Sequence, residues 1–247
     1  MQAGHNRNLV AVSWGRVHIP DGFIDAPTSA AAGAVAVGGV AICLKKAADQ
    51  LDEKRVALAG LTAAFIFAVQ MLNFPVASGT SGHLLGGVLA AVLVGPYIGA
   101  LCVTVVLSVQ CLLFADGGLS ALGLNVVNMA LVTAFGGYVI FLLLRKLLPR
   151  TVGGVVASSG IASALGVVLA SLVFTIEYAI GGTGGASIAT VGGAMVGVHV
   201  LIGIGEGVIT GLTVSAVLAS RPDLVHGARD LYERAPGGSP ALVGDAA

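Results

Sequence analysis

Two histidines lie in polar, glycine-containing stretches of an otherwise apolar chain. His18 belongs to the segment Val-His-Ile-Pro-Asp-Gly-Phe, and His83 follows the segment Ser-Gly-Thr-Ser-Gly. Neutral imidazole is the commonest side-chain metal ligand in proteins. The glycines before His83 permit a close approach of the backbone, and His83 opens a helical pattern instead of lying on its surface. A metal site is therefore one interpretation of these residues, and simple solvation of each histidine is the other.

Carboxylates and amides accompany the histidines. Asp21 and Asp116 lie in predicted outward segments, where a carboxylate can attract a cation or accept a hydrogen bond from a ligand imidazole;. The alternative is that each aspartate caps a helix or turn. Asn125 and Asn128 lie one helical turn apart early in an apolar run. They can hydrogen-bond to the histidine loop or form ordinary polar contacts between helices.

Three ionisable residues, Glu177, His199 and Glu206, lie inside apolar runs. A charged group at the bilayer centre costs about 2.5–3.5 kcal/mol on insertion scales, so these side chains should face the bundle interior or an interface. His199 and Glu206 are two helical turns apart and share one helix face. They form either a proton or metal relay or a structural polar network, while Glu177 is close enough to its span end to reach the interface.

The composition identifies the elements that must position these residues. The chain has 247 residues, of which 56% are hydrophobic and 10% charged, and its mean hydropathy is +0.98. A soluble domain has about 25% charged residues. Continuous apolar runs argue against a β-barrel, and 37 glycines suit close helix packing in lipid;. Balanced charge without a basic domain argues against nucleic-acid binding. The sequence predicts an all-α integral membrane protein embedded in a lipid bilayer.

Six charge-poor runs define the predicted spans. They cover residues 28–44, 56–73, 83–114, 121–144, 153–180 and 191–220. About 20 residues cross the hydrocarbon core, so the run 83–114 is too long for one helix. Gly95-Pro96 near its middle predicts two short helices joined by a tight turn. The prediction is a bundle of seven transmembrane helices.

Lysine and arginine set the predicted orientation, because short cytoplasmic loops are enriched in both. They follow the first, fifth and seventh spans, as Lys45, Lys46, Lys54, Arg55, Arg145, Lys146, Arg150, Arg221, Arg229 and Arg234. These groups share one side only if the turn at Gly95-Pro96 exists. Seven spans with the N-terminus outside and the C-terminus in the cytoplasm satisfy this condition. The predicted outer loops 74–82, 115–120 and 181–190 contain no Lys or Arg.

Both ends of the chain differ in character from the membrane domain predicted for residues 17–220. Arg7 and Arg16 break the charge rule, and residues 1–16 do not form a convincing signal peptide;. We interpret residues 1–16 as a non-native or mis-started extension, because a GTG codon at Val17 can initiate translation. Residues 221–247 are rich in Pro, Gly and charge, which predicts a disordered cytoplasmic tail.

Four motifs in order resemble the CbiM/NikM family of substrate-capture (S) components of energy-coupling-factor transporters for cobalt and nickel. They are HIPDGF, GTSGHLLGG, FADGGLSALGLN and IGEGVITG. The resemblance covers residue 17 to about residue 220. It implies a metal held by the terminal amine at the Val17 position, the amide nitrogen and imidazole of His18, and His83. Four planar nitrogens suit Ni(II). In a chain that starts at Met1, the Val17 nitrogen is an ordinary peptide and cannot be that amine.

The resemblance also implies partners and a location. The protein would be a multi-pass subunit of a prokaryotic cell membrane, with no cofactor, that captures Ni(II) or Co(II) on the outer face. The chain lacks a GxxxxGK[ST] motif, so ATP hydrolysis would fall to cytoplasmic ATPase subunits;. A transmembrane coupling subunit would contact small-residue faces such as 29–39, whose alternative role is internal packing. A small accessory membrane subunit is a further possible partner. Leu84, instead of Pro, after His83 favours nickel over cobalt.

Two other function classes were weighed. A self-sufficient secondary transporter or channel would use Glu177, His199 and Glu206 as its pathway, but seven spans show no inverted repeat. An intramembrane enzyme would need a facing nucleophile and base, and neither HExxH nor GxSxG occurs;. Three cysteines in apolar runs fit neither a CxxC pair nor a disulfide framework, and are expected to be small buried hydrophobes. They are Cys43, Cys102 and Cys111.

Overall fold

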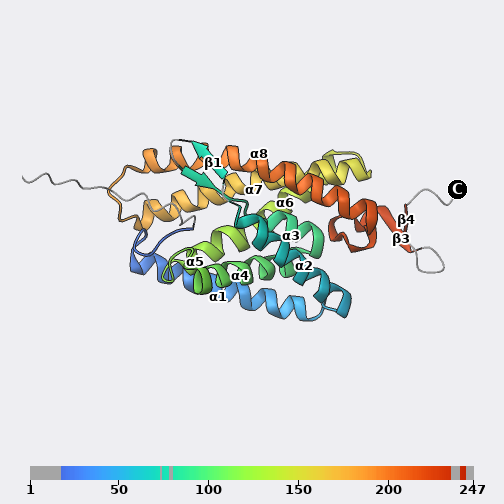
Figure 1. The fold of residues 1–247 in the computed structure, drawn as a ribbon, viewed down its shortest axis with the longest axis horizontal. Coiled ribbons are helices and arrows are strands. Elements are labelled where there is room, and N and C mark those ends of the chain that lie inside the picture. The colour runs from blue at the N-terminus through green and yellow to red at the C-terminus, as the bar shows by residue number, and fades with distance from the viewer. Residues whose placement is uncertain (1–17, 73, 78–79, 235–239, 243–247) are drawn as a thin grey trace, which may run out of the picture.

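The computed structural model describes residues 18–72, 74–77, 80–234 and 240–242, and the described chain is a nearly all-helical bundle (Figure 1). Its main helices are α1 (Ala26–Ala48), α2 (Glu53–Gln70), α3 (Gly87–Val94), α4 (Pro96–Phe114), α5 (Leu122–Asn125), η1 (Val126–Gly137), α6 (Tyr138–Leu147), α7 (Val152–Gly181) and α8 (Ile188–Ser220). The minor elements are the hairpin β1 (Phe74–Ala77) and β2 (Thr80–Gly82), the 3-10 turns η2 (Pro222–Leu224) and η3 (His226–Leu231), and the hairpin β3 (Tyr232–Arg234) and β4 (Pro240–Leu242).

The prediction of an all-α membrane fold is confirmed. Within the described residues, five helical stretches are long and apolar enough to cross a membrane, namely α1, α4, residues 122–147, α7 and α8. The helix α2 has 18 residues and starts with three charged residues. Helix α3 has only eight residues, or about 12 Å, too short to cross a hydrocarbon core alone. The count of seven spans and the orientation of the termini stay predictions.

The predicted turn at Gly95-Pro96 separates α3 from α4. Gly95 has a φ of 94°, a conformation that a residue with a Cβ rarely adopts;. Pro96 occupies the first turn of α4, where its missing N–H costs nothing;. All eight residues of α3 are buried, and α3 packs against α4, η1 and α7. The short helix is therefore the centre of the bundle (Figure 1).

Small residues let the neighbouring helices approach α3 closely. A Cβ at Gly99 of α4 would lie 2.7 Å from the backbone nitrogen of Ala91. A Cβ at Gly137 or Gly166 would meet the side chain of Val88. Residues 126–137 form a π-helix, a geometry that is rare beyond a single turn and is often found at functional sites;. The glycines therefore allow the backbones of neighbouring helices to pack closely around the short buried helix α3.

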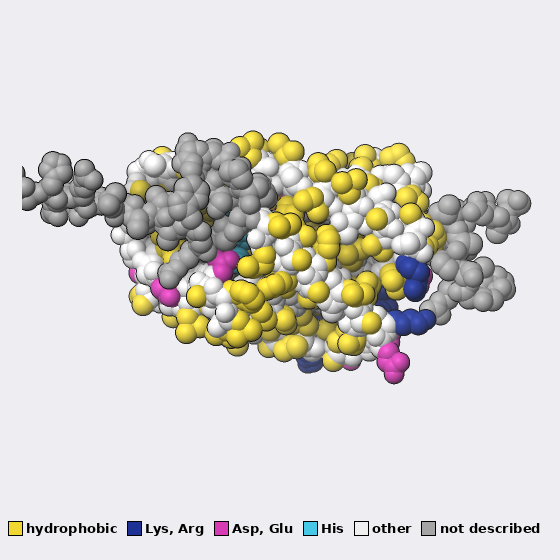
Figure 2. All heavy atoms as spheres, in the orientation of Figure 1, with side chains coloured by type: hydrophobic (Ala, Val, Ile, Leu, Met, Phe, Trp, Pro, Cys, Tyr) yellow, Lys and Arg dark blue, Asp and Glu magenta, His cyan; other side chains and the backbone are white. Residues whose placement is uncertain are grey.

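Lysine and arginine side chains gather at the end of the bundle where α1 and α6 end and α2 begins. Figure 2 shows them toward this end on the face drawn, whereas carboxylates lie toward both ends. The C-terminal segment joins the cationic end, since Arg145 of α6 forms an ion pair with Asp230 at 2.8 Å. This arrangement agrees with the charge asymmetry that the sequence predicts.

The prediction of a disordered tail from residue 221 is wrong for residues 222–231. These residues form η2 and η3, and Val225, Ala228 and Leu231 are buried against the core around α3 and α6. Val225 lies between the two turns, and Ala228 and Leu231 are three residues apart in η3, where side chains at that spacing eclipse;. The segment therefore presents one continuous apolar face, which composition alone did not reveal.

The close contact between α3 and α4 yields a testable prediction. Gly99→Ala should lower the free energy of unfolding by about 1–3 kcal/mol, because the added methyl would overlap fixed backbone atoms of Ala90 and Ala91;. Gly38→Ala in α1 is the matched control, because nothing lies within 4 Å of its added Cβ. Thermal unfolding in detergent should show a lower midpoint for Gly99→Ala only. Equal midpoints for the two variants would contradict this packing.

Candidate metal-binding site

The structure brings His18 and His83 together at the end of the bundle opposite the cationic end. Their ring centroids are 4.8 Å apart in an edge-on arrangement, and each residue is only 6% exposed. His18 comes from the segment before α1, and His83 from the unwound segment before α3. Two buried imidazoles from distant parts of the chain are thus held edge to face. This arrangement excludes the interpretation that each histidine is simply exposed to solvent.

The ring of His83 is oriented by its own neighbour. Its Nδ1 lies 2.8 Å from the carbonyl oxygen of Leu84. A carbonyl can only accept, so Nδ1 carries the hydrogen and Nε2 keeps a free lone pair. An imidazole with one protonated nitrogen and one free lone pair is the form that binds a metal ion.

The ring of His18 lies against a carboxylate. Its Nδ1 is 3.4 Å from Oδ1 of Asp116, and its buried Nε2 has no hydrogen-bond partner among the described residues. A buried polar nitrogen without a partner costs about 1–3 kcal/mol. This unsatisfied nitrogen next to a neutral imidazole fits a ligand set that is completed when a metal ion binds, with Asp116 placed to support one imidazole.

Hydrogen bonds hold the segment that carries His18 in place. Asn125 clamps Ile19 from both sides, because its Oδ1 accepts from the Ile19 nitrogen at 3.1 Å and its Nδ2 donates to the Ile19 oxygen at 3.3 Å. Asp21 Oδ1 accepts from the backbone nitrogen and the hydroxyl of Ser120, at 2.7 and 2.6 Å. The chain that follows His18 is thereby fixed at Ile19 and Asp21.

Two glycines of the Phe-Ala-Asp-Gly-Gly motif make room for this segment. Gly117 has a φ of 91°, and a Cβ there would lie 2.9 Å from the Cβ of His18. A Cβ at Gly118 would collide with the backbone nitrogen of Asp21. The motif therefore combines one carboxylate, Asp116, with two positions where only glycine allows the histidine segment to approach.

A cavity of about 270 Å³ lies beside the two histidines. Its polar lining is His18, His83, Asn125, Asn128 and His199. Asn128 donates to Oε2 of Glu177 at 2.6 Å, and its own buried Oδ1 has no partner among the described residues. Glu177 is 9% exposed, so it is tied to Asn128 and does not reach out to the interface. His199 faces the cavity, with Nδ1 2.7 Å from the Met195 oxygen.

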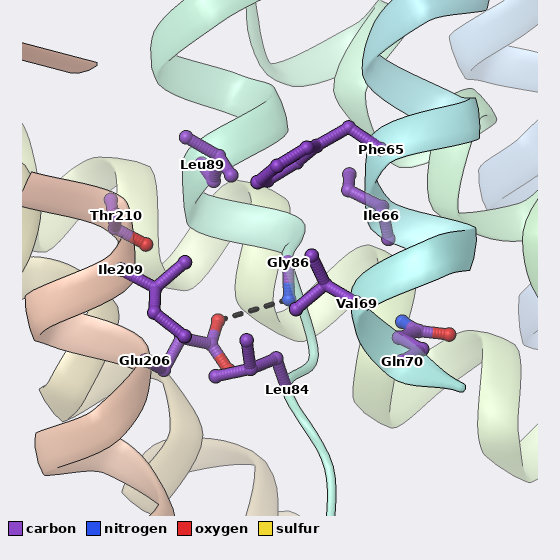
Figure 3. Close-up of a pocket in the computed structure, with 10 residues that line it drawn as sticks. All are labelled: Phe65, Ile66, Val69, Gln70, Leu84, Gly86, Leu89, Glu206, Ile209 and Thr210. Carbon is purple, nitrogen blue, oxygen red and sulfur yellow. Dashed lines mark hydrogen bonds between the residues drawn. The ribbon is translucent and has the colours of Figure 1, made fainter. Parts of the chain in front are cut away.

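Glu206 serves a different purpose from His199, although both lie on one helix. Its carboxylate is 2% exposed and accepts hydrogen bonds from the backbone nitrogens of Leu85 at 2.6 Å and Gly86 at 3.0 Å. Figure 3 shows the bond to Gly86. The hydroxyl of Ser163 donates to the Glu206 carboxylate at 3.2 Å. These amides are at the start of α3, so Glu206 caps the N-terminus of the buried half-helix.

Gln70 completes the support of the unwound segment, and the sequence did not point to it. Its Nε2 donates to the Leu85 oxygen at 2.7 Å, opposite the bond from the Leu85 nitrogen to Glu206. Gly86 has a φ of 79°, and a Cβ there would lie 2.9 Å from the side chain of Ile66. No motif or spacing in the sequence marked Gln70 for this role.

The donors that converge on the site are few. In residues 18–72, 74–77, 80–234 and 240–242, no group of three His, Cys, Asp or Glu side chains could hold a metal ion. A four-coordinate site built on His18 and His83 therefore needs further donors from the backbone. The backbone nitrogen of His18 is next to its ring, and Val17, the proposed amine position, lies outside the described residues.

The fold and the buried histidine pair describe a polytopic membrane protein with a candidate transition-metal site, and comparison with known proteins places it in a family. Residues 18–224 match the family described as CbiM, cobalt uptake substrate-specific transmembrane region. The chain belongs to this family, which confirms the resemblance seen in the sequence.

Individual relatives and a solved structure support the same family assignment. The chain is 40% identical over 210 residues to a putative fused nickel transport protein NikMN of Archaeoglobus fulgidus, covering 85% of this chain and 68% of that protein. It is 32% identical to a cobalt transport protein CbiM of Sorangium cellulosum, covering 90% of this chain and 100% of that protein. A crystal structure of a transition metal transporter matches with a TM-score of 0.75 at 33% identity, over 82% of this chain and 93% of that chain.

The cap on α3 yields a second prediction. Glu206→Ala would leave the buried nitrogens of Leu85 and Gly86 without an acceptor, which should cost about 1–3 kcal/mol per group;. Glu206→Gln keeps one acceptor oxygen and should recover part of the loss. Hydrogen exchange of residues 84–89 should accelerate in Glu206→Ala and less in Glu206→Gln. Unchanged protection in Glu206→Ala would show that this cap does not hold the segment.

Proposed function

We propose that the protein is the metal-capturing subunit of an ATP-driven importer and that it binds Ni(II) on the outer side of a prokaryotic cell membrane. The observation that carries this proposal is the pair of buried, edge-on imidazoles, His18 and His83, at the end of the bundle away from the lysines and arginines. Relatives named for nickel or cobalt transport support the substrate class.

The proposed ligand set is nitrogen only. His83 would bind through Nε2, because Nδ1 is held by the Leu84 carbonyl. His18 would contribute its backbone nitrogen and its Nδ1, because only Nδ1 can close a chelate ring with the backbone nitrogen of the same residue; the ring would turn so that Nε2 faces Asp116. Residue 17 would supply a terminal amine if the chain begins there. The clamp of Asn125 on Ile19 holds this backbone in place before the metal arrives. Nitrogen donors in a plane suit Ni(II), whereas Ca²⁺ and Mg²⁺ require oxygen ligands.

Nickel is favoured over cobalt on two grounds. Leu84, not proline, follows His83, and Leu84 provides the carbonyl that orients the ring. A relative with 40% identity is named for nickel, while relatives named for cobalt are 29% and 32% identical. Co(II) is the alternative substrate of the same site.

The chain would work with partners. ATP hydrolysis requires separate ATPase subunits, and a transmembrane coupling subunit would transmit it. Helix α1 offers a surface for that subunit, because most of its apolar residues are not buried inside the protein. Its residues 29–39 are mostly Ala, Gly and Val. Internal packing accounts for part of this stretch, because a Cβ at Gly123 of α5 would lie 2.5 Å from the Cα of Gly33. A small accessory membrane subunit is a further expected partner.

A self-sufficient transporter is the second candidate, and one observation favours it. The cavity beside the histidines extends to His199 and Ile202 of α8, and it could form the first part of a path for an ion. Against it, Glu206 is committed to the start of α3 and Glu177 to Asn128. A continuous pathway through these three residues would require both hydrogen-bonded pairs to break.

Metal titration tests the ligand set. We expect a form that starts with Met at position 17 to bind one Ni(II), and the form that starts at Met1 to bind much more weakly. His83→Ala should weaken binding at least about 100-fold, because even outer-shell partners contribute about 10–100-fold. His226→Ala, at the other end of the bundle, is the matched control. Calorimetry and the visible spectrum of square-planar nickel provide the readout.

The outcomes of this titration separate the elements of the proposal. Equal affinity of the two starts would exclude the terminal amine as a ligand while leaving the histidine pair. Equal affinity of His83→Ala and the parent would exclude the site itself. A spectrum of six-coordinate, oxygen-bound nickel would exclude the nitrogen-only set.

A transport assay tests the dependence on partners. Proteoliposomes that contain this protein alone should take up no Ni(II), with or without a proton gradient, because the chain has no motif for ATP hydrolysis. Addition of the coupling and ATPase subunits with ATP inside should start uptake. Proton-driven uptake by the isolated protein, abolished by His199→Ala, would favour the self-sufficient transporter instead.

A further inference from the structure

A second, larger cleft opens at the cationic end of the bundle, far from the histidine pair. It has a volume of about 820 Å³ and lies between α6, the turn to α7, and η3. Its charged lining consists of four cationic side chains and one carboxylate, which are Arg145, Lys146, Arg150, Arg229 and Asp230. Figure 2 shows that lysine and arginine side chains gather toward this end of the molecule. The metal site uses none of these residues.

The single carboxylate does not neutralise the cleft. Asp230 pairs with Arg145 at 2.8 Å, and Arg145 is further held by the Pro149 carbonyl at 3.2 Å. In the described part of the chain, no ion pair within 4.0 Å involves Lys146, Arg150 or Arg229. The cleft therefore keeps an excess of positive charge, which Asp52 near Arg229 offsets only in part and which a bound anion would balance.

Two further residues confirm that this excess is not relieved from within. Burial, and then the nearby Arg55, lowers the pKa of Arg229. Burial, and then Arg229, lowers the pKa of His226 to about 4, so this imidazole is neutral at pH 7 and adds no charge. The surroundings of Arg229 thus disfavour its positive charge, and a bound anion would offset that.

The uncharged lining of the cleft is apolar and continues along α6. Tyr138, Phe141, Leu142 and Leu148 form part of its wall. On the same helix Val139, Leu142 and Leu143 are 55%, 43% and 53% exposed, as side chains that face lipid are. A cationic cleft at the end of a lipid-facing aliphatic helix matches a molecule with an anionic head and hydrocarbon tails. A free inorganic anion would not contact the aliphatic surface of α6.

We propose that this cleft binds the headgroup of an anionic phospholipid, with its phosphate against Lys146, Arg150 and Arg229 and its acyl chains along α6. Basic pockets between helices on the cytoplasmic side of a membrane are typical sites for such headgroups. The positive-inside rule places this end at the cytoplasmic leaflet, where anionic lipids are available. The ordered segment 226–230 forms one wall, so the site exists only because the chain after α8 folds back onto the bundle.

Native mass spectrometry of the purified full chain tests the proposal. The protein in mild detergent is mixed with phosphatidylglycerol, cardiolipin or phosphatidylcholine, and bound lipid is counted. The test variant combines Lys146→Gln, Arg150→Gln and Arg229→Gln. The matched control combines Lys45→Gln, Lys46→Gln and Lys54→Gln, which removes the same charge from the same end outside the cleft. Both variants are first shown to be helical by circular dichroism and monodisperse by size exclusion.

The proposal predicts a preference for the anionic lipids that falls about tenfold or more in the test variant and less than about twofold in the control. Equal loss in the two variants would show a diffuse charge effect and overturn the site. Equal binding of phosphatidylcholine would overturn the anionic headgroup. Displacement of the lipid by millimolar inorganic phosphate would assign the cleft to a free anion. Retained binding of the anionic lipids by the test variant would show that they bind elsewhere and would overturn the site.

Discussion

In a membrane, every backbone polar group needs a partner inside the protein. The unwound segment from His83 to Gly86 lacks the hydrogen bonds of a helix, so other parts of the chain must supply its partners. The segment enters the bundle, turns into the eight-residue helix α3 and is surrounded by packed helices. Glu206 accepts from the nitrogens of Leu85 and Gly86, and Gln70 donates to the Leu85 oxygen. Without these three bonds the start of α3 would be buried and unsatisfied. The position of His83 depends on them, because His83 lies only two residues before Leu85.

The second histidine is placed by a different device. His18 lies in a segment without regular secondary structure. Asn125 of α5 and the glycines Gly117 and Gly118 before α5 hold this segment in place. One imidazole is therefore positioned by a capped half-helix and the other by a clamped loop. Both devices are at the same end of the bundle, and the charged, folded-back C-terminal segment is at the other. This polarity suits a protein that acts on one side of a membrane and meets partners or lipid headgroups on the other.

Much of this architecture follows from sequence because lipid imposes simple rules. Apolar runs of spanning length, the break at Gly95-Pro96 and the grouping of cations were readable from composition and spacing. The role of Glu206 was not, since a carboxylate in an apolar helix is consistent with a relay and with a structural polar network. Only the fold shows that it meets the amides of residues 85 and 86. Gln70 gave no signal at all. The ordered segment 222–231 was missed because its three buried residues lie three positions apart within a charged, proline-containing stretch.

The site itself was partly readable. The pairing of His18 and His83 came from a family resemblance, and the structure places the two rings 4.8 Å apart. The contact between Asp116 and His18, and the need for glycine at 117 and 118, depend on long-range packing that local patterns cannot show. Residue 17 lies outside the described residues, so its part in the site stays a prediction.

The most direct measurement of the central claim is X-ray absorption spectroscopy of the Ni(II)-loaded protein. The account predicts a first shell of nitrogen atoms with outer-shell scattering from two imidazole rings, and one imidazole fewer in His83→Ala. An oxygen-rich shell, or the same number of imidazoles in parent and variant, would contradict the claim that His18 and His83 together hold the metal.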